Sequence, residues 1–320
     1  MLSLQNLVSH AVDYAGLFPP ANLSMAQTVA NYAAYTNSPD KNMLGRIVVP
    51  ASRLDEFSHS VAALQPSSTT SDDSAWKISA LVPNVDQSNH SVEFQRAISQ
   101  ILAFNQRFMD RLGSTPAFLV DSIEIKTNSA DQIELTLDLV PREMSSYLEI
   151  DCQTAPIPLL QCLAQSGQPN TFAKIRTGGI VADQIPSLQQ VAGFIAACAR
   201  LQVPFKATAG LHHPLRNEYR LTYEEHPPGG LMHGFINVFV ATVMAFEHRI
   251  QVPTIAEILA DREMANFQFK PEHLVWRDFI ITAEQIRAIR KKSIQSFGSC
   301  SFEEPTRELS GLGFPRLFRG

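Results

Sequence analysis

Short runs of β-branched and apolar residues alternate along this chain with longer stretches of helical periodicity. Six such pairs follow one another, and a polar turn separates the two halves of each. Strands that alternate with helices predict βαβ units and a parallel sheet. The predicted strands are 46–49, 77–82, 122–126, 147–151, 172–176 and 204–208, and the predicted helices are 54–64, 91–108, 131–139, 156–165, 186–201 and 235–247.

Two further units complete the repeat at its ends. Residues 15–18 with a helix over 24–35 form a first unit, and residues 267–269 with a helix over 281–296 form an eighth. Eight units predict a (β/α)8 barrel of the TIM type, built as a single domain over residues 1–320. A doubly wound open sheet is the alternative, but it favours a phosphate-binding glycine fingerprint, and the chain contains neither GxGxxG nor GxxxxGK[ST].

Two segments stand outside the repeat. Residues 212–234 follow the seventh strand and are rich in His, Glu, Arg, Tyr and Gly, which favours a lid-like or binding loop, with a disordered segment as the alternative. Residues 297–320 form a C-terminal tail whose phenylalanines favour packing against the barrel, with a frayed terminus as the alternative.

Four consecutive predicted strands have one apolar and one charged face. Because side chains alternate along a strand, Ile123 and Ile125 share one face, and Glu124 and Lys126 share the other. Helices cover the outside of a barrel, so the charged faces are expected inside it, near the strand ends where barrel enzymes place their sites. Buried charges are costly unless paired, so we expect a polar pocket; a non-catalytic ion-pair network is the alternative. The same alternation adds the following residues to the pocket: Glu149, Asp151, Lys174, Arg176, Lys206 and Thr208.

Two lysines on consecutive strands are the strongest chemical signal. Lys174 lies in KIRTGG and Lys206 in KATAG. Neighbouring ammonium groups and partial desolvation both depress the pKa of an amine, and Schiff-base formation with a carbonyl needs a neutral amine. In these motifs the chain resembles the deoxyribose-phosphate aldolase group of class I aldolases, over about residues 122–210. The resemblance implies that Lys174 forms the Schiff base, that Lys206 lowers its pKa, and that Glu124 relays protons with Lys126 beside it.

The residue two positions after the first lysine departs from that family. Arg176 stands where the family has a small residue, and the glycine-rich phosphate loops after strands seven and eight are not apparent. A guanidinium pairs bidentately with a carboxylate, so Arg176 favours a carboxylated substrate over a sugar phosphate.

Histidines after the seventh strand supply candidate acid/base groups. His212 is expected to be catalytic near neutral pH, while His213 and His233 are expected to contact the substrate. Asp13 and Tyr14 are expected to cap and pack, with a place at the border of the pocket as the alternative. The pair Glu303 and Glu304 is expected to be surface charges unless the tail covers the pocket.

Composition narrows the partners. The formal net charge is −5 at pH 7 without a basic stripe, which disfavours nucleic acid and anionic membranes. No basic run followed by an apolar core begins the chain, and the most apolar stretch, 235–246, is too short to span a bilayer. The four cysteines lack metal-ligand spacing, so we expect reduced thiols in a cytoplasmic protein. The sequence is compatible with a homo-oligomer and does not determine the oligomeric state.

Three functions follow from these patterns. The first is a lyase of the class I aldolase type that acts on a small carbonyl compound, carboxylated or not, without a cofactor. The second is a metal-assisted barrel hydrolase, isomerase or lyase, in which a divalent ion is bound by Glu124, Glu149, Asp151 and His212. No HExxH spacing supports the metal, and the lysines compete for the same carboxylates. The third is a barrel that binds a small anion without catalysis.

Overall fold

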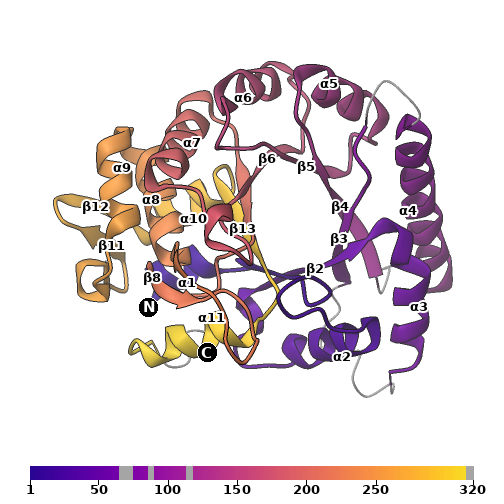
Figure 1. The fold of residues 1–320 in the computed structure, drawn as a ribbon, viewed down its shortest axis with the longest axis horizontal. Helices are drawn as coiled ribbons and strands as arrows, with labels where there is room; N and C mark the ends of the chain where they lie inside the picture. Colours follow the sequence, from indigo (N-terminus) through magenta and orange to yellow (C-terminus); the bar gives the residue numbers. More distant parts are fainter. Residues whose placement is uncertain (65–74, 86–89, 113–117, 315–320) are drawn as a thin grey trace.

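Eight parallel strands close into a barrel with helices around it (Figure 1). The computed structural model describes residues 1–64, 75–85, 90–112 and 118–314. Around the barrel the strands follow the order β1-β13-β7-β6-β5-β4-β3-β2, which confirms the (β/α)8 architecture. The strands are β1 (Val12–Tyr14), β2 (Leu44–Pro50), β3 (Trp76–Leu81), β4 (Phe118–Lys126), β5 (Ser145–Glu149), β6 (Thr171–Arg176), β7 (Phe205–Thr208) and β13 (Ile294–Ser299).

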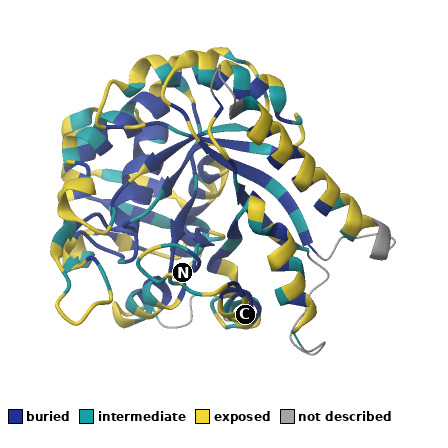
Figure 2. Ribbon diagram, turned by 45° about the vertical axis from the view of Figure 1, so that its right-hand side comes forward, coloured by how far each residue is buried: buried dark blue, intermediate teal, exposed yellow. Residues whose placement is uncertain are grey.

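Most of the outer helices cover the barrel with one face and present the other to solvent (Figure 2). Several begin at a capping box; in the first, Ser24 accepts a hydrogen bond from the backbone of Gln27, whose side chain accepts one from the backbone of Ser24. The helices between strands are α2 (Met25–Thr36), α3 (Leu54–Ala62), α4 (His90–Leu112), α5 (Ala130–Leu139), α6 (Pro156–Gln165), α7 (Leu188–Leu201), α8 (Phe235–His248) and α10 (Ala283–Arg290). Three more helices are α1 (Leu2–Val8), which packs against α10, α9 (Val252–Ala260), which packs against α7 and α8, and α11 (Glu303–Gly311).

The six central units agree with the prediction to within four residues at each strand boundary. The first and the eighth strand do not. The first strand is β1, and the predicted run 15–18 is the turn that follows it. The predicted run 267–269 contributes instead to β10 (Gln268–Phe269), at the edge of a small antiparallel sheet with β11 (His273–Trp276) and β12 (Phe279–Thr282).

The true eighth strand is β13, which lies between β7 and β1. The predicted helix 281–296 therefore ends early, at Arg290, and the chain then turns into the barrel. Ser296 and Gly298 interrupt the apolar pattern of β13, so its strand character is weak in the sequence. Pairing with both neighbours decides its conformation, because an open barrel would leave two rows of backbone groups unpaired.

The predicted loop and tail both contain regular structure. Residues 212–234 include a two-stranded hairpin, β8 (Asn217–Arg220) with β9 (Gly229–Met232). The tail begins with the end of β13 and continues as α11. Phe302, just before this helix, and Leu309, within it, are both buried. Up to residue 314 the tail packs against the barrel, as its phenylalanines indicate; residues 315–320 lie outside the described part.

Among the described residues, no helix combines the length and the apolar character needed to cross a bilayer.

Candidate active site

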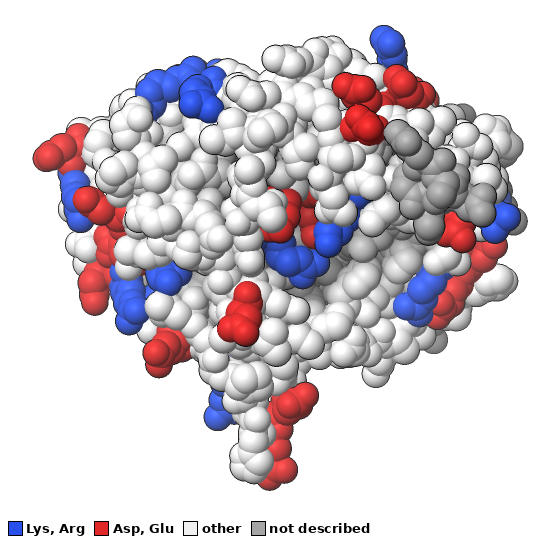
Figure 3. Space-filling view, turned by 45° about the horizontal axis from the view of Figure 1, so that its top comes forward, with Lys and Arg blue, Asp and Glu red and all other residues white. Residues whose placement is uncertain are grey.

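A cavity of 740 Å³ opens where the barrel strands end. Residues from β4, β5, β6 and β7 form its polar floor, and the loops that follow the strands form its walls. On the face drawn in Figure 3, acidic and basic side chains gather in a hollow near the centre. The floor residues are Glu124, Glu149, Lys174, Arg176 and Thr208.

Lys174 lies at the inner end of this cavity. Ala173 and Ile175 on either side of it are buried against the helices, so strand alternation turns Lys174 inward as the sequence predicts. Its Nζ lies 2.8 Å from Oε2 of Glu124 and 2.8 Å from Oε2 of Glu149. The ammonium is buried yet borders the cavity, so a molecule in the cavity can reach it.

Lys206 lies next to Lys174 in the sheet but does not line the cavity. Its Nζ donates to Oδ2 of Asp13 over 2.5 Å and to Oε1 of Glu124 over 2.7 Å. The ring of Tyr147 lies beneath it, with its centroid 5.0 Å from Nζ. Lys206 therefore acts on anything in the cavity only through Glu124.

Asp13 pairs with Lys206 behind the cavity floor and does not line the cavity. It is fully buried and also accepts hydrogen bonds from Ser296 Oγ over 2.7 Å and from the backbone nitrogen of Arg46 over 2.8 Å. Its burial away from the cavity agrees with the expectation that it packs, although β1 begins earlier than predicted and Asp13 is its central residue. The available signal was an aspartate between apolar neighbours, which is typical of an inward charge on a strand.

Glu124 connects the two lysines, since Oε2 contacts Lys174 and Oε1 contacts Lys206. Ser79 Oγ donates a further hydrogen bond to Oε1 over 2.8 Å. Burial opposes ionisation of this carboxyl, but the two ammonium groups outweigh burial and hold its pKa well below its usual range. Glu124 is therefore a carboxylate throughout the neutral range.

The prediction that the lysines depress one another's pKa is wrong for this arrangement. Burial does disfavour the charged form of both amines, but Glu124 and Glu149 raise the pKa of Lys174, and Asp13 and Glu124 raise that of Lys206. Three carboxylates surround two ammonium groups, so attraction exceeds the repulsion between the lysines. Both amines are held in the ammonium form.

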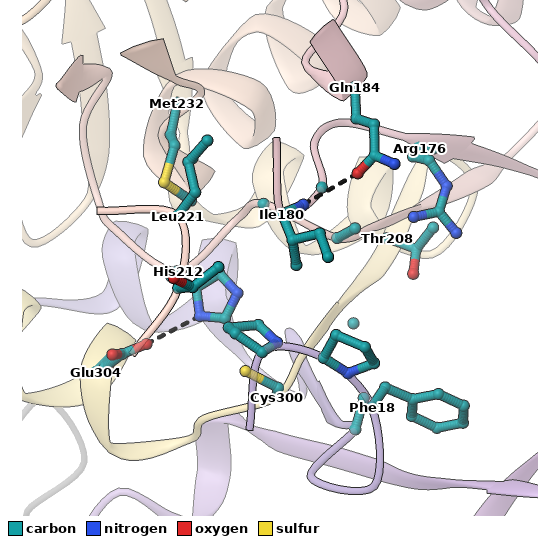
Figure 4. A pocket seen from close by; sticks show the side chains of 18 of the residues that line it. Phe18, Arg176, Ile180, Gln184, Thr208, His212, Leu221, Met232, Cys300 and Glu304 are labelled. Atoms are coloured by element: carbon teal, nitrogen blue, oxygen red, sulfur yellow. Dashed lines mark hydrogen bonds and ion pairs between the residues drawn. The ribbon is translucent and has the colours of Figure 1, made fainter. Parts of the chain in front are cut away.

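Arg176 and Thr208 are paired across β6 and β7 at the cavity wall. The Arg176 side chain is 52% exposed, and its Nε lies 3.5 Å from Oε1 of Glu149. That distance is too long for a good hydrogen bond, so most of the guanidinium donors remain available to a ligand. Figure 4 shows Arg176 and Thr208 on one side of the cavity.

Three of the predicted substrate-binding residues do not line the cavity. Lys126 is the last residue of β4 and is exposed. Asp151 is exposed beyond the end of β5, where strand alternation no longer holds, and its Oδ1 accepts from the backbone nitrogen of Gln153. These positions correct the sequence prediction for Lys126 and Asp151, because neither strand extends far enough to turn the side chain inward.

His233 is the third such residue, and it is fully buried. Its Nε2 lies 2.8 Å from the carbonyl oxygen of Pro186 and its Nδ1 lies 3.1 Å from Nη1 of Arg216. A carbonyl only accepts and a guanidinium only donates, so Nε2 carries the proton and Nδ1 accepts. Burial lowers the pKa of His233 to about 4, so it is a neutral structural residue and not a substrate contact.

His212 and His213 both line the cavity, and each pairs with a glutamate of α11. His212 Nδ1 lies 2.9 Å from Oε2 of Glu304 (Figure 4), and His213 Nδ1 lies 2.7 Å from Oε1 of Glu308. The ring of His213 also stacks on Tyr219 of the hairpin, with 3.5 Å between centroids.

The tail covers the pocket through α11, so Glu304 lines the cavity, and the expected surface position holds only for Glu303, which pairs with Arg307 in solvent. Burial raises the pKa of Glu304, but the hydrogen bond and charge of His212 outweigh it, so the pKa is lowered. The spacing from Glu304 to Glu308 was the available signal, because residues four apart share one helix face.

The structure divides the four ligands of the metal hypothesis. Glu124 and Glu149 pair with Lys174, His212 pairs with Glu304, and Asp151 lies outside the cavity. Within residues 1–64, 75–85, 90–112 and 118–314, no three His, Cys, Asp or Glu side chains are grouped to bind one metal ion.

Comparison with known protein families finds no family model that matches the chain, and no curated protein matches it either. The geometry of the cavity therefore carries the functional argument.

Proposed function

We propose that this protein is an enzyme of the Schiff-base lyase type, similar in chemistry to class I aldolases, in which Lys174 attacks the carbonyl carbon of its substrate. One observation carries the proposal. Among the described residues that line the cavity Lys174 is the sole lysine, and its Nζ lies between two carboxylates at 2.8 Å each. A buried amine with two adjacent proton acceptors, at the strand ends of a barrel, fits this chemistry.

The carboxylates serve the reaction even though they raise the pKa of the lysine. The ammonium first passes a proton to Glu124 or Glu149, and the free amine then adds to the carbonyl to form a carbinolamine. The carboxyl returns that proton to the departing hydroxyl, which leaves as water. The iminium carries the same single positive charge as the ammonium, so the carboxylates still stabilise it electrostatically, with its one N–H donating to one of them. The two carboxylates therefore disfavour only the short-lived neutral amine.

Cleavage then uses the iminium as an electron sink. The bond between the two carbons beyond the iminium breaks while a base removes the proton of a hydroxyl group in the substrate. His212, which lines the cavity and is oriented by Glu304, is the base that we assign to this step. Lys206 keeps Glu124 ionised and in place through its contact with Oε1. Arg176 orients the substrate by pairing with a carboxylate.

Borohydride trapping tests the proposal directly. The protein is incubated with small aldehydes and 2-oxo acids, reduced with sodium cyanoborohydride, digested, and mapped by mass spectrometry. We expect an alkyl adduct on Lys174 that is lost in Lys174→Arg and kept in the control Lys126→Arg, in which an exposed lysine outside the cavity is replaced. Carbonyl binding without an adduct on Lys174 would contradict the proposal.

A second candidate, a small-anion-binding barrel without catalysis, is favoured by the raised pKa of both lysines. A fully paired ammonium is a binding group and not a nucleophile. This candidate expects carboxylates to bind near Arg176 with no adduct on any lysine, so the same trapping experiment distinguishes the two.

A further inference from the structure

Apolar side chains form a large part of the walls above the polar floor, next to charged ones such as Arg220 and Glu224. They come from the turn after β1, the ends of β2 and β3, the loop after β6, and the hairpin of β8 and β9. Figure 4 shows Leu221 and Met232 on one side of the cavity and Ile180 between them and Arg176. The apolar lining residues are Phe18, Pro19, Pro20, Val48, Leu81, Ile180, Leu221 and Met232.

The side chain of Gln184 fixes the backbone at Ile180. The backbone nitrogen of Ile180 donates to Oε1 of Gln184 over 3.0 Å, and a Cβ at the preceding Gly179 would clash with the same Gln184 side chain. The Ile180 side chain is nevertheless 40% exposed and borders the cavity. An isoleucine fixed at the mouth of a cavity gives a ligand an apolar surface that water covers poorly.

The cavity is larger than a two- or three-carbon carbonyl compound would fill. Its 740 Å³ lies well within the range of about 300–1,000 Å³ that is typical of sites for larger organic ligands. A substrate whose carbonyl reaches Lys174 at the inner end must also pass between these walls. An apolar group that filled the space would release water from both surfaces and gain binding free energy.

The polar floor recognises a carbonyl and a carboxylate close together. Glu149 contacts Lys174 through one oxygen and Arg176 through the other, at 2.8 and 3.5 Å. The two cations are therefore close enough for one carboxylate to span them. A 2-oxo acid carries its carbonyl one bond away from its carboxylate, so it can present the first to Lys174 and the second to Arg176.

The charges in and behind the floor are balanced, so no excess negative charge repels a carboxylate. The cations Lys174, Lys206 and Arg176 match the anions Asp13, Glu124 and Glu149 in number, and Lys206 and Asp13 lie behind the floor. Arg176 is the most exposed of the six and makes the longest of these contacts. It is therefore the group with donors to spare for an incoming anion.

From this geometry we infer that the substrate of the proposed Schiff-base reaction is a 2-oxo acid with an apolar side group at least as large as a phenyl ring. The carbonyl lies at Lys174, the carboxylate at Arg176, and the apolar group against Ile180 and Leu221. The inference rests on the proposed function for the carbonyl, but the pairing of a carboxylate with an apolar group is independent of it.

Ligands without a carbonyl test the inference apart from the chemistry. Calorimetry with 3-phenylpropionate and propionate compares the same carboxylate with and without the ring. Burial of the ring should make 3-phenylpropionate bind roughly 10- to 100-fold more tightly. Arg176→Gln should weaken the binding of 3-phenylpropionate by roughly tenfold and leave that of 3-phenylpropanamide unchanged, because the neutral amide has no charge to pair.

A matched pair of variants tests the apolar wall. Ile180→Ser should weaken the binding of 3-phenylpropionate by roughly threefold to tenfold. Val181→Ser is the control: this neighbour has a similar exposed fraction, 46%, but does not line the cavity, so the affinity should stay unchanged. Equal losses in the two variants would contradict the placement of the ring.

Trapping with phenylpyruvate and pyruvate separates the inference from the proposed function. We expect both to form the Lys174 adduct, with phenylpyruvate half-saturating the reaction at a concentration roughly tenfold or more below that of pyruvate. Adducts without such a preference, together with equal affinities for the two propionates, would overturn the inference and leave the proposed function standing. Tight binding of 3-phenylpropionate without any adduct would overturn the proposed function and support the ligand class.

Discussion

Oδ2 of Asp13 lies 2.5 Å from Nζ of Lys206, although the two residues are 193 positions apart in the chain. Asp13 belongs to β1 and Lys206 to β7, and both strands flank β13 in the closed barrel. The same carboxylate accepts a hydrogen bond from Ser296 of β13. The Asp13 carboxylate therefore joins three strands, through its ion pair with Lys206 and its hydrogen bond from Ser296. The ion pair also fixes Lys206 behind the cavity floor.

Replacing Asp13 by Asn should destabilise the protein strongly. The amide keeps the shape but removes one of the two carboxylates that pair with Lys206, and leaves it Glu124, which Lys174 shares. Breaking a buried ion pair in this way costs up to about 3–5 kcal/mol of unfolding free energy. Urea unfolding followed by circular dichroism measures this loss. Glu56→Gln is the control, because Glu56 pairs with Arg53 in solvent and such pairs contribute at most about 1 kcal/mol. Similar losses in the two variants would show that the Asp13–Lys206 pair has no special role.

Glu149→Gln should make Lys174 more reactive toward aldehydes. The substitution removes one of the two carboxylates that raise the pKa of Lys174, so a larger fraction of the amine is neutral at a given pH. Reductive alkylation by formaldehyde at pH 8, quantified peptide by peptide, should be roughly tenfold faster at Lys174 in the variant. The exposed Lys126 provides the internal reference in each sample. An unchanged ratio of the two rates would mean that Glu149 does not hold the proton on Lys174.

Glu304→Gln should change the tautomer and the acid/base behaviour of His212. In the native protein the carboxylate accepts from Nδ1, which leaves Nε2 free as a base. An amide can donate to Nδ1 instead, which stabilises the other tautomer. Nitrogen NMR of labelled His212 reports the tautomer. Turnover of a substrate identified by the trapping experiment should fall by roughly 10- to 100-fold, with an altered pH profile.

Glu308→Gln is the matched control for His212. Glu308 lies on the same helix and pairs with His213, so it should leave the signals of His212 unchanged. If both variants shift His212 alike, α11 acts as a structural cover and Glu304 has no positioning role.

His233 should make the protein less stable in mild acid. Its pKa falls from 6.5 to about 4 on folding because burial disfavours the charged ring. The unfolded chain therefore binds a proton that the native state does not, and the stabilisation present above about pH 6.5 is lost as the pH falls toward 4. About 3 kcal/mol is involved. His233→Gln, which keeps a donor and an acceptor, should reduce the slope of unfolding free energy against pH in this range, whereas the exposed control His226→Gln should not.

The sequence predicted the floor of the site better than its walls. Alternation along a strand is a local property, and each of the four strands is long enough to show it. It therefore identified the inward residues Glu124, Glu149, Lys174, Arg176 and Lys206. The lid-like segment was recognised from its composition, but its hairpin and the contacts of its histidines with α11 involve residues more than 90 positions apart. Local periodicity carries no information on such pairs.

What the sequence determined by itself is the alternation of strands and helices, and with it the barrel and the inward charges of four strands. The tertiary structure alone decided where β1 and β13 lie, because their short and partly polar runs become strands only when both neighbours supply hydrogen bonds. It also decided the charge state of the lysines. The pKa of an amine depends on every charge within a few ångströms, and Asp13 comes close to Lys206 only once the barrel has closed.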